Sequence, residues 1–360
     1  MRRTAYALGG ATAVVVAGAV VVAVSPTGGE QPSARPAASV APGGEADLAA
    51  NWLVRQLTRG TVRDQERDVE DLGQAIDIAL AVDELGDRRA AVAAVAGAVA
   101  AERREFTRDD GELLPGPAAQ ALYLLQSQGE DAGGLRGDLE AAASTDPLFP
   151  GRLRGSTRDT LPEVVGQAYA ARSLVDSASP RAADVASFLL DQQCTAGWFR
   201  VGFAALDAPD QTCDGGAGSR PDADVTALVL LLLGPVADEV EGGEGAMERA
   251  ARWLVTEQTD SGLVPGGESG RPNAVTTGLA ARALGAWGST AAAARAAEAL
   301  VPLQLTTGID AGAVAYDEPD LAVGRASGLG VPPPDRWRRA TTQAAPALRW
   351  LDPGSAGQDG

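Results

Sequence analysis

The stretch that decides the fold is Phe188-Leu-Leu-Asp-Gln-Gln-Cys-Thr-Ala-Gly-Trp-Phe199, together with Asp222-Ala-Asp-Val-Thr-Ala-Leu-Val-Leu230. The first part has the apolar spacing of a helix and closes with a glycine and two aromatic residues. A loop with a second cysteine follows, and two aspartates then open a more apolar helix. This order predicts a helical hairpin whose two helices are joined by a long loop.

Weaker copies of this unit recur along the chain. Trp253-Leu-Val-Thr-Glu-Gln258-Thr-Asp-Ser-Gly262 matches Phe188–Gly197 at the aromatic, leucine, glutamine and glycine positions, and Gln304-Leu-Thr-Thr-Gly308 repeats the spacing from glutamine to glycine. The second helices also align, with Ala-Ala-Arg-Ser-Leu174 in one and Ala-Ala-Arg-Ala-Leu284 in another. They start near residues 71, 117, 162, 222, 273 and 320, so the repeat is roughly 45 to 60 residues long.

The periodicity predicts an all-α protein, because helical patterns alternate with loops and no strand alternation is found. About six hairpins favour a closed α/α toroid, with an inner and an outer ring of helices, over an open solenoid. Small residues such as Gly166 and Gly278 would let inner helices approach closely. The predicted helices span residues 46–58, 69–86, 88–105, 117–128, 134–144, 162–177, 181–193, 222–238, 246–258, 273–286, 289–304, 319–329 and 335–351.

The N-terminus has the pattern of an export segment. Arg2 and Arg3 precede an apolar run that ends at Ser25-Pro26, so residues 1–25 are predicted to be a signal peptide or a membrane anchor. Residues 26–45 form a linker rich in Pro, Gly and Ala, residues 46–352 the toroid domain, and residues 353–360 a disordered tail. The predicted location is therefore outside the cytoplasm, either secreted or anchored at the cell surface.

Charge and composition exclude several classes of function. The formal net charge is −18, which argues against nucleic acid as a partner because the phosphate backbone attracts a basic surface. The chain has no histidine, the commonest zinc ligand and the commonest general base at neutral pH, so neither a metal site nor a cofactor is predicted. Cys194 and Cys213 are its only cysteines, and in an exported protein they are expected to form a disulfide. On the loop-entropy argument this bond contributes roughly 3 kcal/mol.

The motif Gln193-x-x-x-Gly197-x-Phe199 resembles the QxxxGxW repeat of squalene–hopene cyclases and related prenyltransferase-type α/α toroids. The copies at Gln258 and Gln304 resemble degenerate forms of it. The resemblance covers residues 46–352 through the rhythm of the hairpins. It implies that the glutamine and the aromatic residue tie the end of an outer helix to the turn that follows.

Asp222-Ala-Asp224-Val-Thr-Ala resembles the DxDDTA acid motif of class II terpene cyclases. The resemblance implies that Asp224 donates a proton to an alkene or epoxide and that Asp222 supports it. Val225 stands where the last aspartate of the motif belongs, and the chain is poor in the aromatic residues that stabilise carbocations. The alternative is that Asp222 or Asp224 caps the N-terminus of a helix.

Further candidates are ligand-binding residues. Trp198 and Phe199 follow the turn glycine and are either packing residues or a platform for a ligand. Asp317 and Asp320 belong to an acidic cluster that could join Asp222 and Asp224 in a rim binding Ca²⁺ or a cationic ligand, or could be caps and solvated charges.

The sequence favours binding over catalysis. We expect a small, extended or lipid-like ligand in the central cavity or at the acidic rim. Cobalamin carriers, which share the helical ring, are a precedent that implies a membrane or surface partner protein. The alternatives are a class II cyclase or isoprenoid-processing enzyme that uses Asp224 as acid, a carbohydrate-active enzyme with paired carboxylates, and a structural surface protein.

Overall fold

The computed structural model describes residues 44–64, 69–86, 88–154, 163–215, 219–267, 270–330 and 334–351. The chain divides into two compact units, Met1–Pro36 and Ala37–Gly360, and every described residue belongs to the second. The predicted export segment 1–25, most of the linker and the tail 353–360 lie outside the described residues. Within the described part, no helix is both long and apolar enough to cross a membrane.

The described residues form fourteen α-helices, in agreement with the predicted all-α class. They are α1 Gly44–Gln56, α2 Leu72–Asp83, α3 Arg89–Ala101, α4 Arg103–Thr107, α5 Pro115–Ser127, α6 Leu135–Ala142, α7 Glu163–Asp176, α8 Ala182–Leu190, α9 Ala223–Leu233, α10 Gly243–Glu257, α11 Ala274–Trp287, α12 Thr290–Leu300, α13 Glu318–Ser327 and α14 Asp335–Ala347.

Short 3₁₀ helices and strands complete the secondary structure. The 3₁₀ helices are η1 Gly234–Glu239, η2 Val301–Leu303 and η3 Leu348–Trp350. The prediction that strands are absent is wrong in detail, because three two-residue antiparallel pairs occur in loops between helices: β1 Arg63–Asp64 with β2 Val69–Glu70, β3 Arg108–Asp109 with β4 Glu112–Leu113, and β5 Pro265–Gly266 with β6 Arg271–Pro272. Strands of two residues are too short to show a period of two in the sequence.

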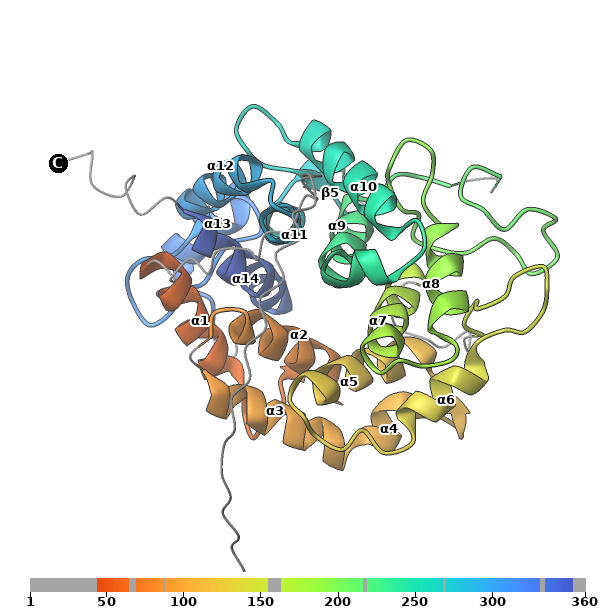
Figure 1. The fold of residues 1–360 in the computed structure, drawn as a ribbon. Coiled ribbons are helices and arrows are strands. Elements are labelled where there is room, and N and C mark those ends of the chain that lie inside the picture. The colour runs from red at the N-terminus through yellow and green to blue at the C-terminus, as the bar shows by residue number, and fades with distance from the viewer. Residues whose placement is uncertain are drawn as a thin grey trace, which may run out of the picture. The chain divides into compact units, whose positions relative to one another are not determined.

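The helices of this unit form a closed double ring (Figure 1). Helices α2, α5, α7, α9, α11 and α14 form the inner ring, and each packs against the next in that order. Helix α14 returns to α2 and to α1, so the ring closes between the two ends of the unit. The predicted α/α toroid is confirmed, and the open solenoid is not formed.

One inner helix was assigned wrongly. The sequence placed the sixth inner helix near residue 320, whereas α14 occupies that place and α13 is short, with only Leu321 and Gly324 buried among its residues. An inner helix is enclosed on several sides and needs small or apolar residues around most of its circumference. Nine residues of α14 are buried, and they include the polar residues Arg338 and Thr341. Because its buried face is partly polar, the sequence of α14 does not show the apolar pattern expected of an inner helix.

The repeated glutamine links each turn to the next outer helix. The Gln193 side-chain amide donates to the carbonyl oxygen of Gly197 at 2.9 Å and to that of Ala246 in α10 at 2.8 Å. The same two bonds recur from Gln258 to Gly262 and Ala292, and from Gln304 to Gly312 and Glu45. Each copy therefore fastens one hairpin to its neighbour, and the last copy fastens the turn after η2 to α1.

The glycine of the last copy is Gly312, which corrects the predicted partner Gly308. Gly312 has a φ of +104°, and a Cβ there would lie 2.0 Å from the carbonyl oxygen of Leu48 in α1. A Cβ on the turn glycine Gly197 would likewise lie 2.6 Å from the carbonyl oxygen of Arg249. Four additional residues in the last turn hid this correspondence, because they moved the essential glycine away from the expected spacing.

Candidate functional site: a pocket at the centre of the ring

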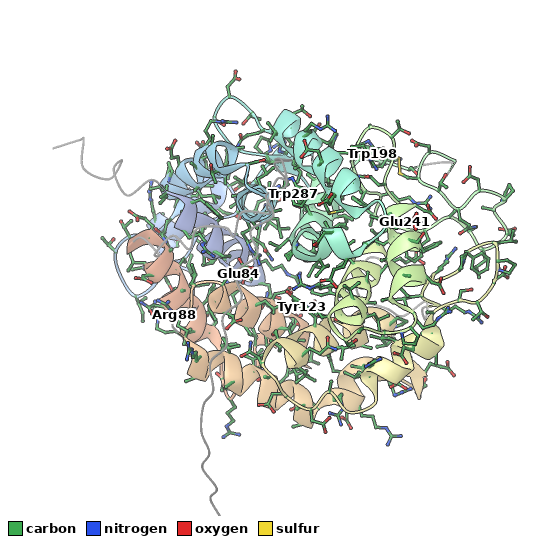
Figure 2. The ribbon with its side chains drawn as sticks, in the orientation of Figure 1. Glu84, Arg88, Tyr123, Trp198, Glu241 and Trp287 are labelled. Carbon is green, nitrogen blue, oxygen red and sulfur yellow. A yellow bond between two sulfur atoms is a disulfide. The ribbon has the colours of Figure 1, made fainter. Side chains whose placement is uncertain are left out.

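A pocket of about 380 Å³ lies at the centre of the inner ring, and all six inner helices contribute to it. It lies toward the C-terminal ends of these helices, and its lining includes residues near or just beyond each end: Glu84, Ser127, Arg172, Pro235, Ala286 and Trp350. Figure 2 shows Glu84 and Tyr123 on the inner side of the ring.

Much of the pocket wall is apolar. Leu228 and Leu231 of α9 and Leu279 of α11 form part of this wall. Tyr123 and Tyr169 add a pair of tilted rings whose centroids are 5.7 Å apart. Burial raises the pKa of both phenols, so both remain uncharged hydroxyl groups at neutral pH. The wall can therefore accommodate a hydrocarbon or aromatic body.

A carboxyl group lies in this pocket. Asp77, midway along α2, accepts a hydrogen bond at 2.8 Å from the side-chain amide of Gln120. Burial raises the pKa of Asp77 to about 6, although the positive charges of Arg339 and Arg282 act in the opposite direction. The group is thus mainly ionised at neutral pH and mainly protonated below about pH 5.

An arginine joins three inner helices around the pocket. The Arg282 side chain, in α11, is only 6% exposed and forms an ion pair with Glu84, which follows α2, and a hydrogen bond with Gln343 of α14. Burial lowers the pKa of Arg282, but Glu84, Tyr169 and Asp77 together outweigh burial and raise it. The guanidinium remains charged, and its charge is satisfied within the protein.

Two further arginines of the pocket bond to helix ends. Arg172 donates to the carbonyl oxygen of Leu232 at 2.9 Å and pairs with Asp176 at 2.8 Å. Arg349 donates to the backbone carbonyl of Glu84 at 3.0 Å. Carbonyl groups at helix C-termini lack partners within their own helix and carry partial negative charge, which cations stabilise. These arginines therefore hold the C-terminal ends of α9 and α2 in place.

The two aspartates of the predicted acid motif lie at the beginning of α9, and neither lines the central pocket. Asp222 is the N-cap, and its carboxylate accepts from the Val225 amide at 2.8 Å. Asp224 is largely buried, and one of its oxygens, Oδ1, has no hydrogen-bond partner. Burial raises the pKa of Asp224 to about 6, against the lowering effect of the Thr276 hydroxyl. The capping role of Asp222 is confirmed, and the catalytic roles stay predictions.

Asp224→Asn should change how stability depends on pH. A buried carboxyl whose folded pKa is above its unfolded value stabilises the protein at low pH, and this contribution is lost as the pH rises through about 6. Wild type should therefore lose about 2 kcal/mol through this group between pH 3.5 and pH 8, and the variant should not. Urea unfolding at both pH values measures the difference. Asp222→Asn is the matched control, because asparagine is an equally good N-cap. Equal pH profiles of Asp224→Asn and wild type would contradict the assignment.

The predicted ligand-binding aromatic residues lie away from the central pocket. Phe199 is fully buried, and its backbone amide donates to the Thr226 hydroxyl at 2.9 Å, which joins the turn to α9. Trp198 is half-buried, and Figure 2 places it at the outer side of the ring. Phe199 is therefore a packing residue of the hairpin, as one of the two sequence interpretations had it. A ligand-binding role for Trp198 stays a prediction.

The acidic pair Asp317 and Asp320 also lies outside the pocket lining. Asp317 is the N-cap of α13 and accepts from the backbone amide of Asp320 at 3.0 Å. Asp320 pairs with Arg336 at 3.0 Å, and that guanidinium stacks 4.1 Å from the centre of the Tyr316 ring. Both carboxylates thus have partners within the protein. Their role in ligand binding stays a prediction.

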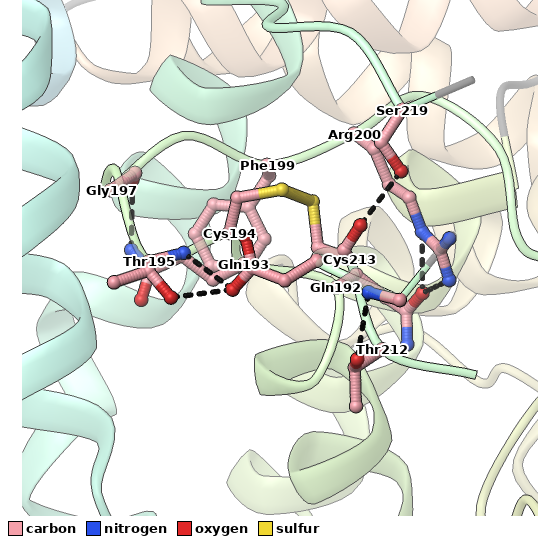
Figure 3. The surroundings of a disulfide bond; sticks show 12 residues. Gln192, Gln193, Cys194, Thr195, Gly197, Phe199, Arg200, Thr212, Cys213 and Ser219 are labelled. Carbon is pink, nitrogen blue, oxygen red and sulfur yellow. Dashed lines mark hydrogen bonds between the residues drawn. A yellow bond between two sulfur atoms is a disulfide. The ribbon is translucent and has the colours of Figure 1, made fainter. Parts of the chain in front are cut away.

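The predicted disulfide between Cys194 and Cys213 is present, with the two Cα atoms 4.8 Å apart (Figure 3). It closes the long loop between α8 and α9. The buried guanidinium of Arg200 donates to the Gln192 side chain at 2.9 Å and to the backbone carbonyl of Gln211 at 2.6 Å, so polar bonds hold the loop beside the disulfide. The loop between α8 and α9 is therefore held in a fixed conformation by the disulfide and these hydrogen bonds.

Comparison with known proteins identifies the fold but no family. No protein-family model matches the chain, and no curated protein matches it. Among solved structures, a protein from Actinoplanes aligns with a TM-score of 0.58 and 16% identity, over 85% of this chain and 98% of its own. A type II terpene cyclase from Scytonema aligns with a TM-score of 0.56 and 13% identity, over 85% and 96%. An α-1,6-mannanase of family GH76 from Salegentibacter sp. aligns with a TM-score of 0.59 and 13% identity, over 86% and 99%.

These likenesses show that the fold of this chain is an α/α toroid. A cyclase and a glycosidase share the fold at similar scores, so the fold does not select a function. The residues of the pocket were missed by the sequence reasoning, although two signals were present. Asp77 is the only charged residue between Leu72 and Val82, and Arg172 and Arg282 occupy the same position of two aligned repeats.

Proposed function

We propose that this protein binds a small amphipathic molecule in the central pocket. The observation that supports the proposal is a single cavity, bordered by all six inner helices, that combines a leucine-rich wall with Asp77, Gln120 and Tyr169. Ligand sites are usually concave and mainly apolar, with a few polar groups that fix orientation. The volume of about 380 Å³ is within the range of roughly 300 to 1,000 Å³ typical of such sites.

The pocket is a space that the side chains of the protein leave unfilled, which favours ligand binding. Interiors of proteins pack closely and contain few voids larger than a water molecule. Leaving a cavity of this size between six helices costs dispersion contacts that larger side chains would recover. A bound apolar body would restore those contacts, and the pocket is open at the ends of the inner helices, so a ligand can enter.

Blocking the pocket tests the proposal with an uncharged probe, N-phenyl-1-naphthylamine, whose fluorescence increases in apolar surroundings. Wild type should bind one probe per chain saturably. Ala286→Trp places an indole at the pocket opening and should weaken binding about tenfold or more, because the ring would occupy the space of the probe. Ala291→Trp, at an exposed position of the neighbouring outer helix α12, is the matched control and should bind like wild type.

Unchanged binding in the blocked variant would contradict the proposal. If Ala286→Trp and Ala291→Trp bind the probe as wild type does, the central pocket is not the binding site. Circular dichroism and the midpoint of urea unfolding would confirm that both variants retain the fold.

We also propose that the protein acts outside the cytoplasm, anchored at the cell surface or secreted. The apolar run before Ser25 and the Cys194–Cys213 disulfide support this location, because disulfides persist in oxidising compartments. A partner protein at the membrane or the surface would fit a binding role. Fractionation of cells that express the full chain tests the location: recovery only in the cytoplasm, with both thiols reduced, would contradict it.

Acid catalysis on an isoprenoid is the second candidate function. It is favoured by the carboxyl of Asp224, whose raised pKa increases the fraction of the group that carries a proton near neutral pH. Incubation with squalene or geranylgeraniol, followed by mass spectrometry, should then yield cyclic products with wild type and none with Asp224→Asn. A carbohydrate-active enzyme would need two carboxylates facing one groove, and Asp77 and Asp83 of α2 are the pocket residues that such a test would vary.

A further inference from the structure

We propose that the occupant of the central pocket is an organic cation, with an ammonium-type group against Asp77 and an apolar body along the leucine wall. This inference rests on the proposed binding function and names the class of ligand. It follows from the balance of charges around the pocket, the aromatic rings beside it and the orientation of the inner helices.

Asp77 is a pocket carboxylate with no cationic side chain of the described residues in direct contact, although the charges of Arg339 and Arg282 act on it. Its hydrogen-bond partner is the neutral amide of Gln120, and no ion pair joins it to another described residue. Glu84, in contrast, is paired with Arg282. An ionised carboxylate away from bulk water is costly unless a positive charge accompanies it. A cationic ligand would give Asp77 the direct ion-pair partner that no described residue provides.

Two of the three described arginines that line the pocket are already paired with carboxylates of the protein and are not available to an anionic ligand in the same way. Arg282 is held by Glu84 and Gln343, and Arg172 by Asp176 and the Leu232 carbonyl. Arg349 donates to the carbonyl of Glu84, and its buried Nε has no hydrogen-bond partner in the described part of the chain. An anion would have to replace these bonds before it could pair with Arg282 or Arg172. The cost of removing them favours a ligand of positive charge.

The surroundings of Asp77 favour a cation in two further ways. Tyr123 and Tyr169 line the pocket, and the faces of aromatic rings attract positive charge. The pocket also lies toward the C-terminal ends of the six inner helices, where the partial charge of each helix dipole is negative. The acidic net charge of the chain adds a long-range attraction for cations.

Other charged groups act on Asp77 and set the pH dependence. Arg339 of α14 and Arg282 of α11 favour its ionised form, whereas Asp71 at the start of α2 opposes it. Burial, supported by Asp71, outweighs the two arginines and raises the pKa of Asp77 to about 6. Binding of a cation needs the ionised carboxylate, so affinity should fall as the pH falls through this value.

Three probes with one carbon skeleton test the inference on the full-length chain: 4-phenylbutylamine, 4-phenylbutan-1-ol and 4-phenylbutyrate. Isothermal titration at pH 7.5 should show the amine binding about tenfold tighter than the alcohol, since a hydrogen bond to a charged partner is stronger than a neutral one. The butyrate should bind most weakly. The advantage of the amine should disappear in Asp77→Asn and at pH 4.5.

Glu298→Gln is the control, because Glu298 is an exposed carboxylate of the outer helix α12 that does not line the pocket, and this variant should keep the advantage. Binding of N-phenyl-1-naphthylamine by Asp77→Asn checks that its pocket is intact. If the alcohol or the butyrate binds as tightly as the amine, or if Asp77→Asn keeps the preference, the cation inference is overturned while the proposed function stands. If no probe of any charge binds, the proposed function fails and the inference fails with it.

Discussion

Gly312→Ala should lower the free energy of unfolding by about 4 kcal/mol, because two costs coincide at this position. The residue has a φ of +104°, which side chains other than that of glycine rarely adopt. The added Cβ would lie 2.0 Å from the Leu48 carbonyl oxygen in α1, and backbone cannot move aside as a flexible side chain would. Urea unfolding followed by circular dichroism measures the loss.

Gly308→Ala is the control for this prediction. Gly308 also has a positive φ, +82°, but nothing lies within 4 Å of the position its Cβ would take. The strain alone should cost about 1 kcal/mol. The two variants separate the contribution of the ring closure from that of backbone strain. A similar loss in both variants would mean that the contact between the last turn and α1 contributes nothing to stability.

Arg282→Met should be destabilising by about 3 kcal/mol, since it leaves the Glu84 carboxylate and the Gln343 side chain without their partner. The loss should be larger than that of Arg172→Met, whose ion pair with Asp176 is more exposed. Adding Glu84→Gln to Arg282→Met should recover part of the stability, because the unpaired charge is then removed. The same unfolding experiment tests all four proteins, with wild type as the reference.

A cost below about 1 kcal/mol for Arg282→Met would show that Arg282 does not hold α2, α11 and α14 together. Such a result would also weaken the cation inference, because that inference requires the Arg282 guanidinium to be paired with Glu84. The unfolding measurement and the probe titrations therefore both depend on the ion pair between Arg282 and Glu84.

Much of the fold follows from the sequence because the hairpin unit recurs. The glutamine motif at Gln193 and Gln258 predicted turns fastened to outer helices, and the structure confirms the bonds that do this. Small residues marked the close contacts of the inner ring: a Cβ on Gly166 would lie 2.9 Å from the Cα of Gly116. These features are local in sequence, so pattern alone can detect them.

The parts that were missed depend on contacts between residues far apart in the chain. Gly312 matters because it meets Leu48 across the ring closure, and α14 is an inner helix because α1, α2 and α11 enclose it. A repeated hydroxyl could have revealed α14: Thr226, Thr277 and Thr341 each accept from the backbone amide of a preceding turn.

The candidate site was harder to predict for a related reason. The motif at Asp222 and Asp224 drew attention to the beginning of α9, whereas the central pocket lies toward the opposite ends of the inner helices. Its residues are single side chains from six helices that only the closed ring brings together. Asp77 belongs to no sequence motif, and its raised pKa results from its position inside the closed ring.

A crystal structure of the full-length chain with bound 4-phenylbutylamine tests the central claim most directly. We expect the phenyl ring beside Leu228 and Leu279 and the amine nitrogen within hydrogen-bond distance of Asp77, in the middle of the inner ring. Density for the amine at any other place, with the central pocket holding only water at saturating amine, would contradict it.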